Sequence, residues 1–238
     1  MNWTPDTLRG EPWLDFLGYQ SGHGDDQRTL AWIHSGPVAQ TWTRQPTKPI
    51  LNLEPPYEAH LAYQSRQPHS DYSVRRACYW SLLATPVAGL TYGGHGIWSW
   101  QTLAGRPKDH EGTGVAQPWR VAKDLPGAGQ MTHLADLFTS LRWPELRPAQ
   151  VWLADQPGGS DASRFVALCR TPDGRQGVAY LPVGGAIRLQ QGALAAGAKA
   201  EWIDPRTGKS QPATSDKPGE FSAPDERDWL LAWRDDAK

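Results

Sequence analysis

The first 145 residues alternate short apolar segments with helix-length segments three times, and this alternation limits the possible folds more than any other feature. The strand-like segments are 13–20, 49–53 and 87–92. The helix-length segments are 25–44, 71–83 and 130–141. Gly36-Pro37 should break the first helix, and Asp71 should cap the second. Such a repeat is typical of a parallel α/β sheet or of part of a (β/α) barrel.

The sequence changes character after Pro144. Short strand-like segments follow one another at 151–154, 164–170, 176–182, 200–203 and 228–233. Turn residues separate them at 157–159, 172–174 and 204–208. This spacing predicts a small all-β sandwich of roughly 90 residues. We therefore expect an α/β domain over residues 1–145 and an all-β domain over residues 146–238.

Composition and motifs exclude several classes of protein. The 24 basic and 25 acidic residues give a formal net charge of −1, which argues against nucleic acid or an acidic membrane as a partner. No apolar stretch approaches the ~18 residues that a membrane-spanning helix needs. The seven histidines and two cysteines lack metal-ligand spacing, and no nucleotide-binding glycine motif follows a strand. We expect no metal and no cofactor.

Polar and aromatic residues follow all three predicted strands of the first domain. They are Gln20 and His23 after the first strand, Glu54, Tyr57 and Glu58 after the second, and Tyr92, His95, Trp98 and Trp100 after the third. Ligands of parallel α/β folds bind at the carboxyl ends of the strands. Carboxylates, an amide, imidazoles and indole rings together suit a sugar, whose hydroxyls need polar partners and whose C–H faces stack on rings.

Structural roles are the alternative for each of these groups. Glu54, before two prolines, also fits a surface loop, and Glu58 fits a charge at a helix N-terminus. His23 and His95 lie among glycines and also fit a role in satisfying loop backbone groups. The spacing of Trp98 and Trp100 also fits one core ring and one exposed ring.

Six segments of the chain resemble motifs of one family, the apiosidase-like glycoside hydrolases, also called DUF4038. WLDFLGYQSGHG, KPILNLEPPYE, the stretch 75–101 and PGAGQMTHLADLF resemble its catalytic domain. AEWIDPRTGKSQP and DWLLAWR resemble the β-domain that often follows, which carries the label of a collagen-binding domain of a collagenase. No residue of this chain marks collagen recognition, so a supporting or glycan-contacting role fits that β-domain equally well.

The resemblance implies a (β/α)8 barrel that hydrolyses glycosidic bonds of plant-type polysaccharide with retention, through two carboxylates. By motif, Glu54 is the nucleophile, and Glu58 is a second candidate or an orienting residue. The resemblance also implies that an oligo- or polysaccharide contacts Gln20, His23, Tyr57, Tyr92, His95, Trp98 and Trp100.

The same resemblance implies that the barrel is partial. A complete (β/α)8 barrel takes about 250 residues, and motif order places the first strand of this chain sixth in the barrel. The expected fold is the last three βα units followed by a small β-sandwich. The family's acid/base residue belongs to the earlier units, so we expect an inactive fragment. Relatives are usually exported, but no signal peptide follows Met1, so the localisation stays open.

A partial barrel should leave the outer edge of strand 13–20 unpaired. We therefore expect self-association through that edge, or exposed apolar surface that binds a hydrophobic dye; a compact monomer without such surface would refute this. A non-catalytic carbohydrate- or matrix-binding protein is the alternative function, because binding needs only the aromatic groups and the β-domain. A gene product without function is a third possibility.

Overall fold

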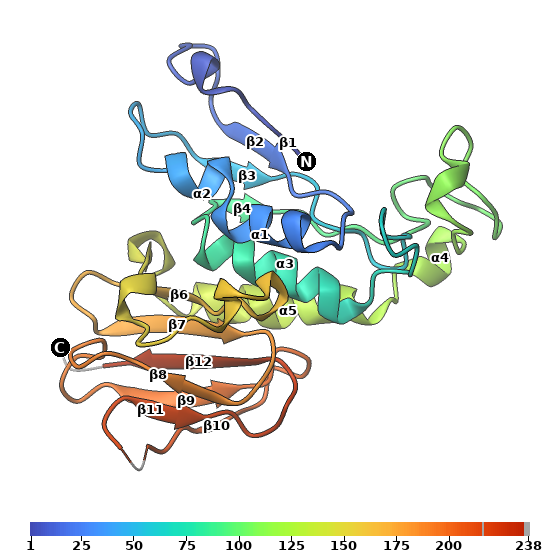
Figure 1. Cartoon of the computed structure of the whole chain (residues 1–238). Coiled ribbons are helices and arrows are strands. Elements are labelled where there is room, and N and C mark those ends of the chain that lie inside the picture. The colour runs from blue at the N-terminus through green and yellow to red at the C-terminus, as the bar shows by residue number, and fades with distance from the viewer. Residues whose placement is uncertain (216, 236–238) are drawn as a thin grey trace. The chain divides into compact units, whose positions relative to one another are not determined.

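The computed structural model describes residues 1–215 and 217–235. The chain divides into two compact units, Met1–Thr132 and His133–Lys238, and each unit is described by itself (Figure 1). The helices and strands of the first unit are β1 (Asn2–Trp3), β2 (Leu17–Gln20), α1 (Gln27–Ser35), α2 (Pro37–Thr41), β3 (Ile50–Asn52), α3 (Asp71–Leu83), β4 (Gly89–Leu90), α4 (Trp119–Ala122) and α5 (Pro126–Thr139), whose last residues belong to the second unit. Short 3-10 helices lie at Asp6–Leu8 and Glu111–Thr113.

Four strands of the first unit form one sheet in the order β1-β2-β3-β4. β2, β3 and β4 run parallel, with Leu17 opposite Ile50 and Asn52 opposite Leu90. The three expected strands are therefore present and parallel, although each is shorter than its apolar segment. Because the carboxyl ends of parallel strands meet at one edge of a sheet, the loops after β2, β3 and β4 come together there.

The helix boundaries follow local sequence signals. Asp26 accepts a hydrogen bond from the backbone N–H of Thr29 and caps α1, and Gly36 ends this helix just before Pro37 begins α2. The predicted cap of α3 is wrong by one residue. Ser70, not Asp71, accepts from the backbone N–H of Ser73, and Asp71 is the first helical residue. Both residue types cap helices well, so the sequence did not distinguish them.

The outer edge of β2 is not bare, contrary to the expectation for strand 13–20. β1 pairs antiparallel with it, with Asn2 opposite Gln20 and Trp3 opposite Tyr19. The expectation failed because two residues are enough to cover this short strand and carry too little periodicity to be recognised in a sequence.

A buried amide links the strands of the first unit. Asn52, at the end of β3, is fully buried and donates to the hydroxyls of Ser21 (3.0 Å) and Ser81 (2.9 Å). Its side-chain oxygen accepts from the backbone N–H of Glu54 at 3.3 Å. Beside it lies an apolar cluster from the strands and the helices that cover them: Leu17, Tyr19, Val38, Ile50 and Val87.

The second unit is mainly antiparallel. Its strands are β5 (Arg147–Pro148), β6 (Ala167–Arg170), β7 (Gln176–Leu181), β8 (Ala186–Arg188), β9 (Lys199–Ile203), β10 (Ser210–Pro212), β11 (Glu220–Ser222) and β12 (Trp229–Arg234). A six-stranded sheet has the order β10-β9-β12-β7-β6-β5, and β8 and β11 pair separately. One core joins the two sheets, since Leu168, Leu231 and Trp233 of the large sheet cluster with Ile187 and Phe221 of the small one.

The predicted strand at 151–154 is wrong. Gln150–Trp152 forms a 3-10 helix, closed by the backbone bond from the N–H of Leu153 to the carbonyl of Gln150. Only Leu153 makes a β-bridge, with Leu189. The apolar side chain that suggested a strand, Val151, is largely exposed. Pro157–Gly159, expected as a turn, is likewise a 3-10 helix; further 3-10 turns lie at Trp143–Glu145 and Ala162–Arg164.

No helix within residues 1–215 and 217–235 is long and apolar enough to cross a membrane.

The Asn52 amide yields a stability prediction. We expect Asn52→Ala to lower the free energy of unfolding by about 3 kcal/mol, because it removes every hydrogen bond of a buried amide and leaves a cavity. Asn2, the only other asparagine of the chain, is exposed, and Asn2→Ala should change stability by less than about 0.5 kcal/mol. Urea denaturation of both variants measures the difference, and equal values would contradict the structural role of Asn52.

Candidate functional site

The carboxylate of Glu54 lies at the edge where the parallel strands end, and two side chains from the end of β2 hold it. The amide of Gln20 contacts its Oε2 at 2.7 Å, and Nε2 of His23 contacts its Oε1 at 3.0 Å. The backbone carbonyl of Glu54 accepts from the N–H of Gly22 at 2.9 Å, which ties the two loops together. The Glu54 side chain remains 28% exposed. A carboxylate that is fixed on both oxygens and still reached by solvent can meet a ligand.

His23 itself is buried, with 3% of its surface exposed. Its Nδ1 accepts from the backbone N–H of Tyr57 at 3.2 Å. Its ring stacks on His60 at a centroid distance of 4.0 Å, and the Tyr57 and Tyr63 rings meet it edge-on. His69 reaches the backbone carbonyl of His23 through Nε2 at 3.1 Å. The side chain predicted to contact sugar is thus enclosed by other rings.

His95 and Trp98 extend this ring cluster. The His95 ring lies 5.3 Å from that of His60, and the indole N–H of Trp98 donates to Nδ1 of His95 at 3.3 Å. The Trp98 ring also lies 6.4 Å from that of Tyr57 and is half-buried. We name these residues the ring cluster: His23, Tyr57, His60, Tyr63, His69, His95 and Trp98.

Burial keeps the imidazoles of the ring cluster neutral. Loss of solvent lowers the pKa of His23 to about 3 and that of His60 to about 4, and it also lowers the pKa of His69 and of His95. The contact between His23 and Glu54 is therefore a hydrogen bond from a neutral ring and not an ion pair. Desolvation raises the pKa of the Glu54 carboxyl, and the charge of the Met1 amino group opposes this rise. Hydrogen bonds from Gln20 and His23 favour the ionised form. No group of three or more His, Cys, Asp or Glu in the described part of the chain is arranged to hold a metal ion.

Glu58 points away from solvent, and its environment differs from that of Glu54. The side chain is buried, and its Oε2 accepts from the Tyr92 hydroxyl at 2.7 Å and from the backbone N–H of Gly127 at 2.9 Å. Gly127 is the second residue of α5, so the carboxylate lies at a helix N-terminus, where negative charge is favoured. Burial raises the pKa of Glu58 and also that of Tyr92, which its contact with Glu58 raises further. These contacts fit the structural role that the sequence left open for Glu58, and Tyr92 takes part in them. We call the two hydrogen bonds that Glu58 accepts, from Tyr92 and from Gly127, the Glu58 tether.

Gly93 and Gly127 leave room for the side chains of Tyr57 and Glu58. A Cβ at position 93 would lie 1.9 Å from the Tyr57 ring, and a Cβ at position 127 would lie 2.4 Å from Oε2 of Glu58. Neither distance is possible for a real side-chain atom.

The structure separates the two tryptophans that the sequence placed in one site. Trp98 belongs to the ring cluster, whereas Trp100 is 65% exposed and stacks on Trp119 at 4.8 Å. Trp100 has a left-handed backbone conformation, with φ at 49°. The structure therefore brings together Gln20, His23, Glu54, Tyr57, His95 and Trp98, and it does not bring Trp100 to them.

Sequence reasoning missed His60, Tyr63 and His69, which complete the ring cluster. They lie in the irregular segment between β3 and α3, where no periodicity assigns a direction to a side chain. The one usable signal is the crowding of His60 and Tyr63 after Glu54, in EPPYEAHLAY; His69 lies beyond this run.

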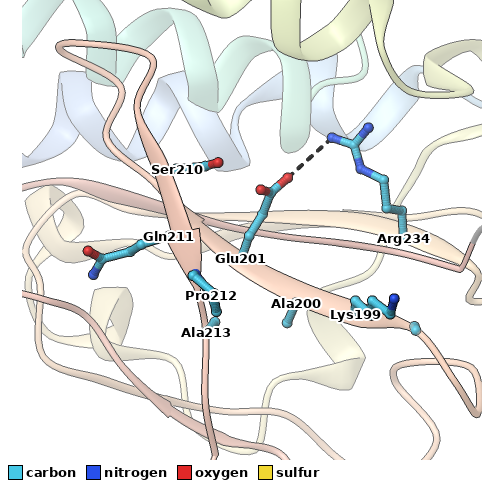
Figure 2. A pocket seen from close by; sticks show the side chains of 9 residues that line it. Lys199, Ala200, Glu201, Ser210, Gln211, Pro212, Ala213 and Arg234 are labelled. Atoms are coloured by element: carbon cyan, nitrogen blue, oxygen red, sulfur yellow. Dashed lines mark hydrogen bonds and ion pairs between the residues drawn. The ribbon is translucent and has the colours of Figure 1, made fainter.

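A groove in the second unit was not predicted. It has a volume of about 680 Å³ and lies over β9 and β10. Figure 2 shows its polar groups, Lys199, Glu201, Ser210, Gln211 and Arg234, with Glu201 paired to Arg234 at 3.3 Å. No aromatic ring lines this groove, so it lacks the stacking surface of the ring cluster.

The neutral imidazoles predict acid sensitivity. Unfolded imidazoles bind protons near pH 6.5, whereas His23 and His60 bind them in the folded state only near pH 3 and 4. Stability should therefore fall between pH 6.5 and about 4.5, by about 1.4 kcal/mol per pH unit for each of these two imidazoles. The raised pKa values of Glu54 and Glu58 oppose the fall in the lower part of this range, because the folded carboxyls take up protons at a higher pH than the unfolded ones do. Urea denaturation at several pH values measures the slope of stability against pH. His60→Gln should lower this slope by the contribution of one imidazole, about 1.4 kcal/mol per pH unit. An unchanged slope would contradict the burial of His60.

The tether of Glu58 predicts opposite effects of one substitution at two positions of α5. Gly127→Ala should lower the free energy of unfolding by about 2 kcal/mol, because its methyl group displaces the buried carboxylate. Gly129→Ala should raise it by up to about 1 kcal/mol, because Gly129 is exposed and nothing lies within 4 Å of its Cβ position. Thermal denaturation compares the two, and effects of the same sign would contradict the tether.

One family model and several solved glycoside hydrolases match this chain. The model of the apiosidase-like catalytic domain matches residues 1–145. A solved glycoside hydrolase is 25% identical, with a TM-score of 0.77 over 96% of this chain and 54% of its own. A glycoside hydrolase of family 5 from Bacteroides vulgatus is 22% identical, with a TM-score of 0.79 over 97% of this chain and 52% of its own.

A more distant likeness extends the shared fold. A GH30 endoxylanase from Clostridium papyrosolvens is 12% identical, with a TM-score of 0.50 over 97% of this chain and 52% of its own. No curated protein matches the chain in sequence. The chain spans about half the length of these solved structures. Its mixed α/β fold is similar to glycoside hydrolase folds, and because the family model matches more than half of its residues, the chain belongs to the apiosidase-like family of catalytic domains.

Proposed function

We propose that this chain carries the nucleophile of a retaining glycoside hydrolase and that Glu54 is that nucleophile. The observation that supports this most is the state of its carboxylate, which two donors hold and which solvent still reaches. In the retaining mechanism an ionised carboxylate attacks the anomeric carbon, while a protonated carboxyl ~5–5.5 Å away releases the leaving group. Hydrogen bonds to both oxygens favour the ionised form that attack requires.

Glu58 is not the acid/base in this proposal. It is buried, and its Oε2 already accepts from the Tyr92 hydroxyl and from the N–H of Gly127. We propose that residues outside these 238, which span about half the length of the similar structures, supply the acid/base. The 238 residues alone are then expected to lack turnover on natural glycans.

The architecture proposed for the whole protein follows from the same relatives. Residues 1–145 are proposed as the last three βα units of a (β/α)8 barrel, which is consistent with the parallel order of β2, β3 and β4. Residues 146–238 are proposed as a β-sandwich of the collagen-binding type, supported by two sheets that share one core.

The proposed substrate is an oligo- or polysaccharide of plant type. Tyr57 and Trp98 are half-buried rings of the ring cluster, which suits stacking on the C–H face of a sugar. Gln20 supplies a further polar group, while His95 is buried and accepts from the indole N–H of Trp98. Trp100, on its separate stack with Trp119, is left out of the proposed subsite.

A substrate with an activated leaving group tests the nucleophile without the acid/base. Dinitrophenolate departs without protonation, so a bond from a Glu54 oxygen to the anomeric carbon of a dinitrophenyl glycoside replaces the bond to dinitrophenolate. The covalent sugar ester should accumulate, because no base activates water to remove it. We expect mass spectrometry of peptides, after incubation with a panel of such glycosides, to find the ester on Glu54 and none in Glu54→Gln.

An ester on Glu58 or on any other residue would refute the role of Glu54. Complete absence of labelling, together with saturable binding of a glycan in calorimetry, would favour the alternative function, a non-catalytic carbohydrate- or matrix-binding protein.

A further inference from the structure

The hydrogen bonds of His23 define which of its nitrogens carries the proton. A backbone N–H can only donate, so the bond from the N–H of Tyr57 requires an unprotonated Nδ1 on His23. The single proton of the neutral ring is then on Nε2, which lies 3.0 Å from Oε1 of Glu54. Nε2 therefore donates to the carboxylate.

The other imidazoles of the ring cluster are defined in the same way. Nδ1 of His60 lies 2.7 Å from the carbonyl of Leu61, and Nε2 of His69 lies 3.1 Å from the carbonyl of His23, so each of these nitrogens carries a proton. Nδ1 of His95 accepts from the indole N–H of Trp98. In each of these imidazoles, a hydrogen-bond partner therefore determines which nitrogen carries the proton.

Protonation of His23 is opposed from several sides. A second proton on Nδ1 would point at the N–H of Tyr57, and the ring is buried against the stacked His60. The titratable groups that face it are Glu54, Tyr57, His60, Tyr63, His69, His95 and the amino group of Met1. Among these groups only the Glu54 carboxylate would attract a positively charged His23 ring. That carboxylate already accepts a hydrogen bond from the neutral ring.

We propose that His23 is a positioning residue for Glu54, a neutral Nε2–H donor that holds Oε1 while Gln20 holds Oε2. This deepens the proposed function, since it assigns to His23 a role other than contact with the sugar. With both oxygens fixed, the carboxylate plane cannot rotate freely, and its lone pairs keep one direction. A ring that cannot become charged holds this arrangement across the physiological pH range.

Two amide substitutions distinguish the Nε2 donor of His23, which contacts Glu54, from its Nδ1 acceptor, which contacts the N–H of Tyr57. In His23→Gln the amide nitrogen can occupy the place of Nε2 and donate to Glu54. His23→Asn is shorter, so its amide reaches only the place of Nδ1 and the donor to Glu54 is lost. Both variants remove the ring and its stacking on His60, so they are matched in the packing that they disturb.

The experiment is an NMR titration of the full chain. In the wild type, ¹⁵N shifts should show Nε2 of His23 protonated and Nδ1 unprotonated at every pH from 5 to 8. Carboxyl ¹³C shifts should show a pKa of Glu54 at least about 1 higher in His23→Asn than in the wild type, because a donor to the ionised form is lost. His23→Gln should return it to within about 0.3 of the wild type. A merely structural role would lower the stability of both variants without this difference.

Several results would overturn the proposal: a proton on Nδ1 of His23, titration of its ring near pH 6.5, or an equal Glu54 pKa in the wild type and His23→Asn. The labelling of Glu54 by dinitrophenyl glycosides distinguishes failure of the positioning role of His23 from failure of Glu54 as the nucleophile. Labelling that proceeds in His23→Asn within twofold of the wild-type rate refutes positioning and leaves the nucleophile. No labelling of the wild type, with the NMR result as expected, refutes the nucleophile and leaves the hydrogen bond.

Discussion

The parallel pairing of β2 with β3 is the constraint on which the candidate site depends. It places the loop that carries Gln20 and His23 beside the loop that carries Glu54. Asn52, at the end of β3, supports this pairing. Its buried amide donates to Ser21 in the loop after β2 and to Ser81 in α3. Because that amide also accepts from the N–H of Glu54, the same residue holds the sheet together and sets where the loop leaves it.

The two carboxylates show how environment separates similar groups only four residues apart. Glu54 is held by two side chains and stays partly exposed, while Glu58 is held by a phenol and by the first turn of α5. One is free to meet a ligand, and the other connects a strand end to a helix. Spacing alone left both possible as reactive groups. Each carboxylate binds two donors, so the difference follows from burial: Glu58 is 4% exposed and the Glu54 side chain 28%.

Much of this organisation was readable in the sequence, and the exceptions have physical reasons. The strands, the break at Gly36-Pro37 and the meeting of Gln20, His23 and Glu54 follow from apolar runs, breakers and the geometry of parallel strands. His60 and His69 were missed because loop side chains have no period. The spacing of Trp98 and Trp100 left open which ring is exposed, and in the structure it is Trp100, which stacks on Trp119. The segment at 151–154 failed because a short apolar run does not distinguish a strand from a 3-10 turn.

The glycines at 93 and 127 have a consequence for recognising relatives. Each is small because another residue occupies its missing side-chain volume: the Tyr57 ring at one and the Glu58 carboxylate at the other. A distant homologue that replaces either glycine must also have lost or moved the aromatic or acidic neighbour, so these positions should change in pairs. An alignment that keeps Glu54 but breaks both pairs would describe a protein with the attacking group and without the scaffold that surrounds it here.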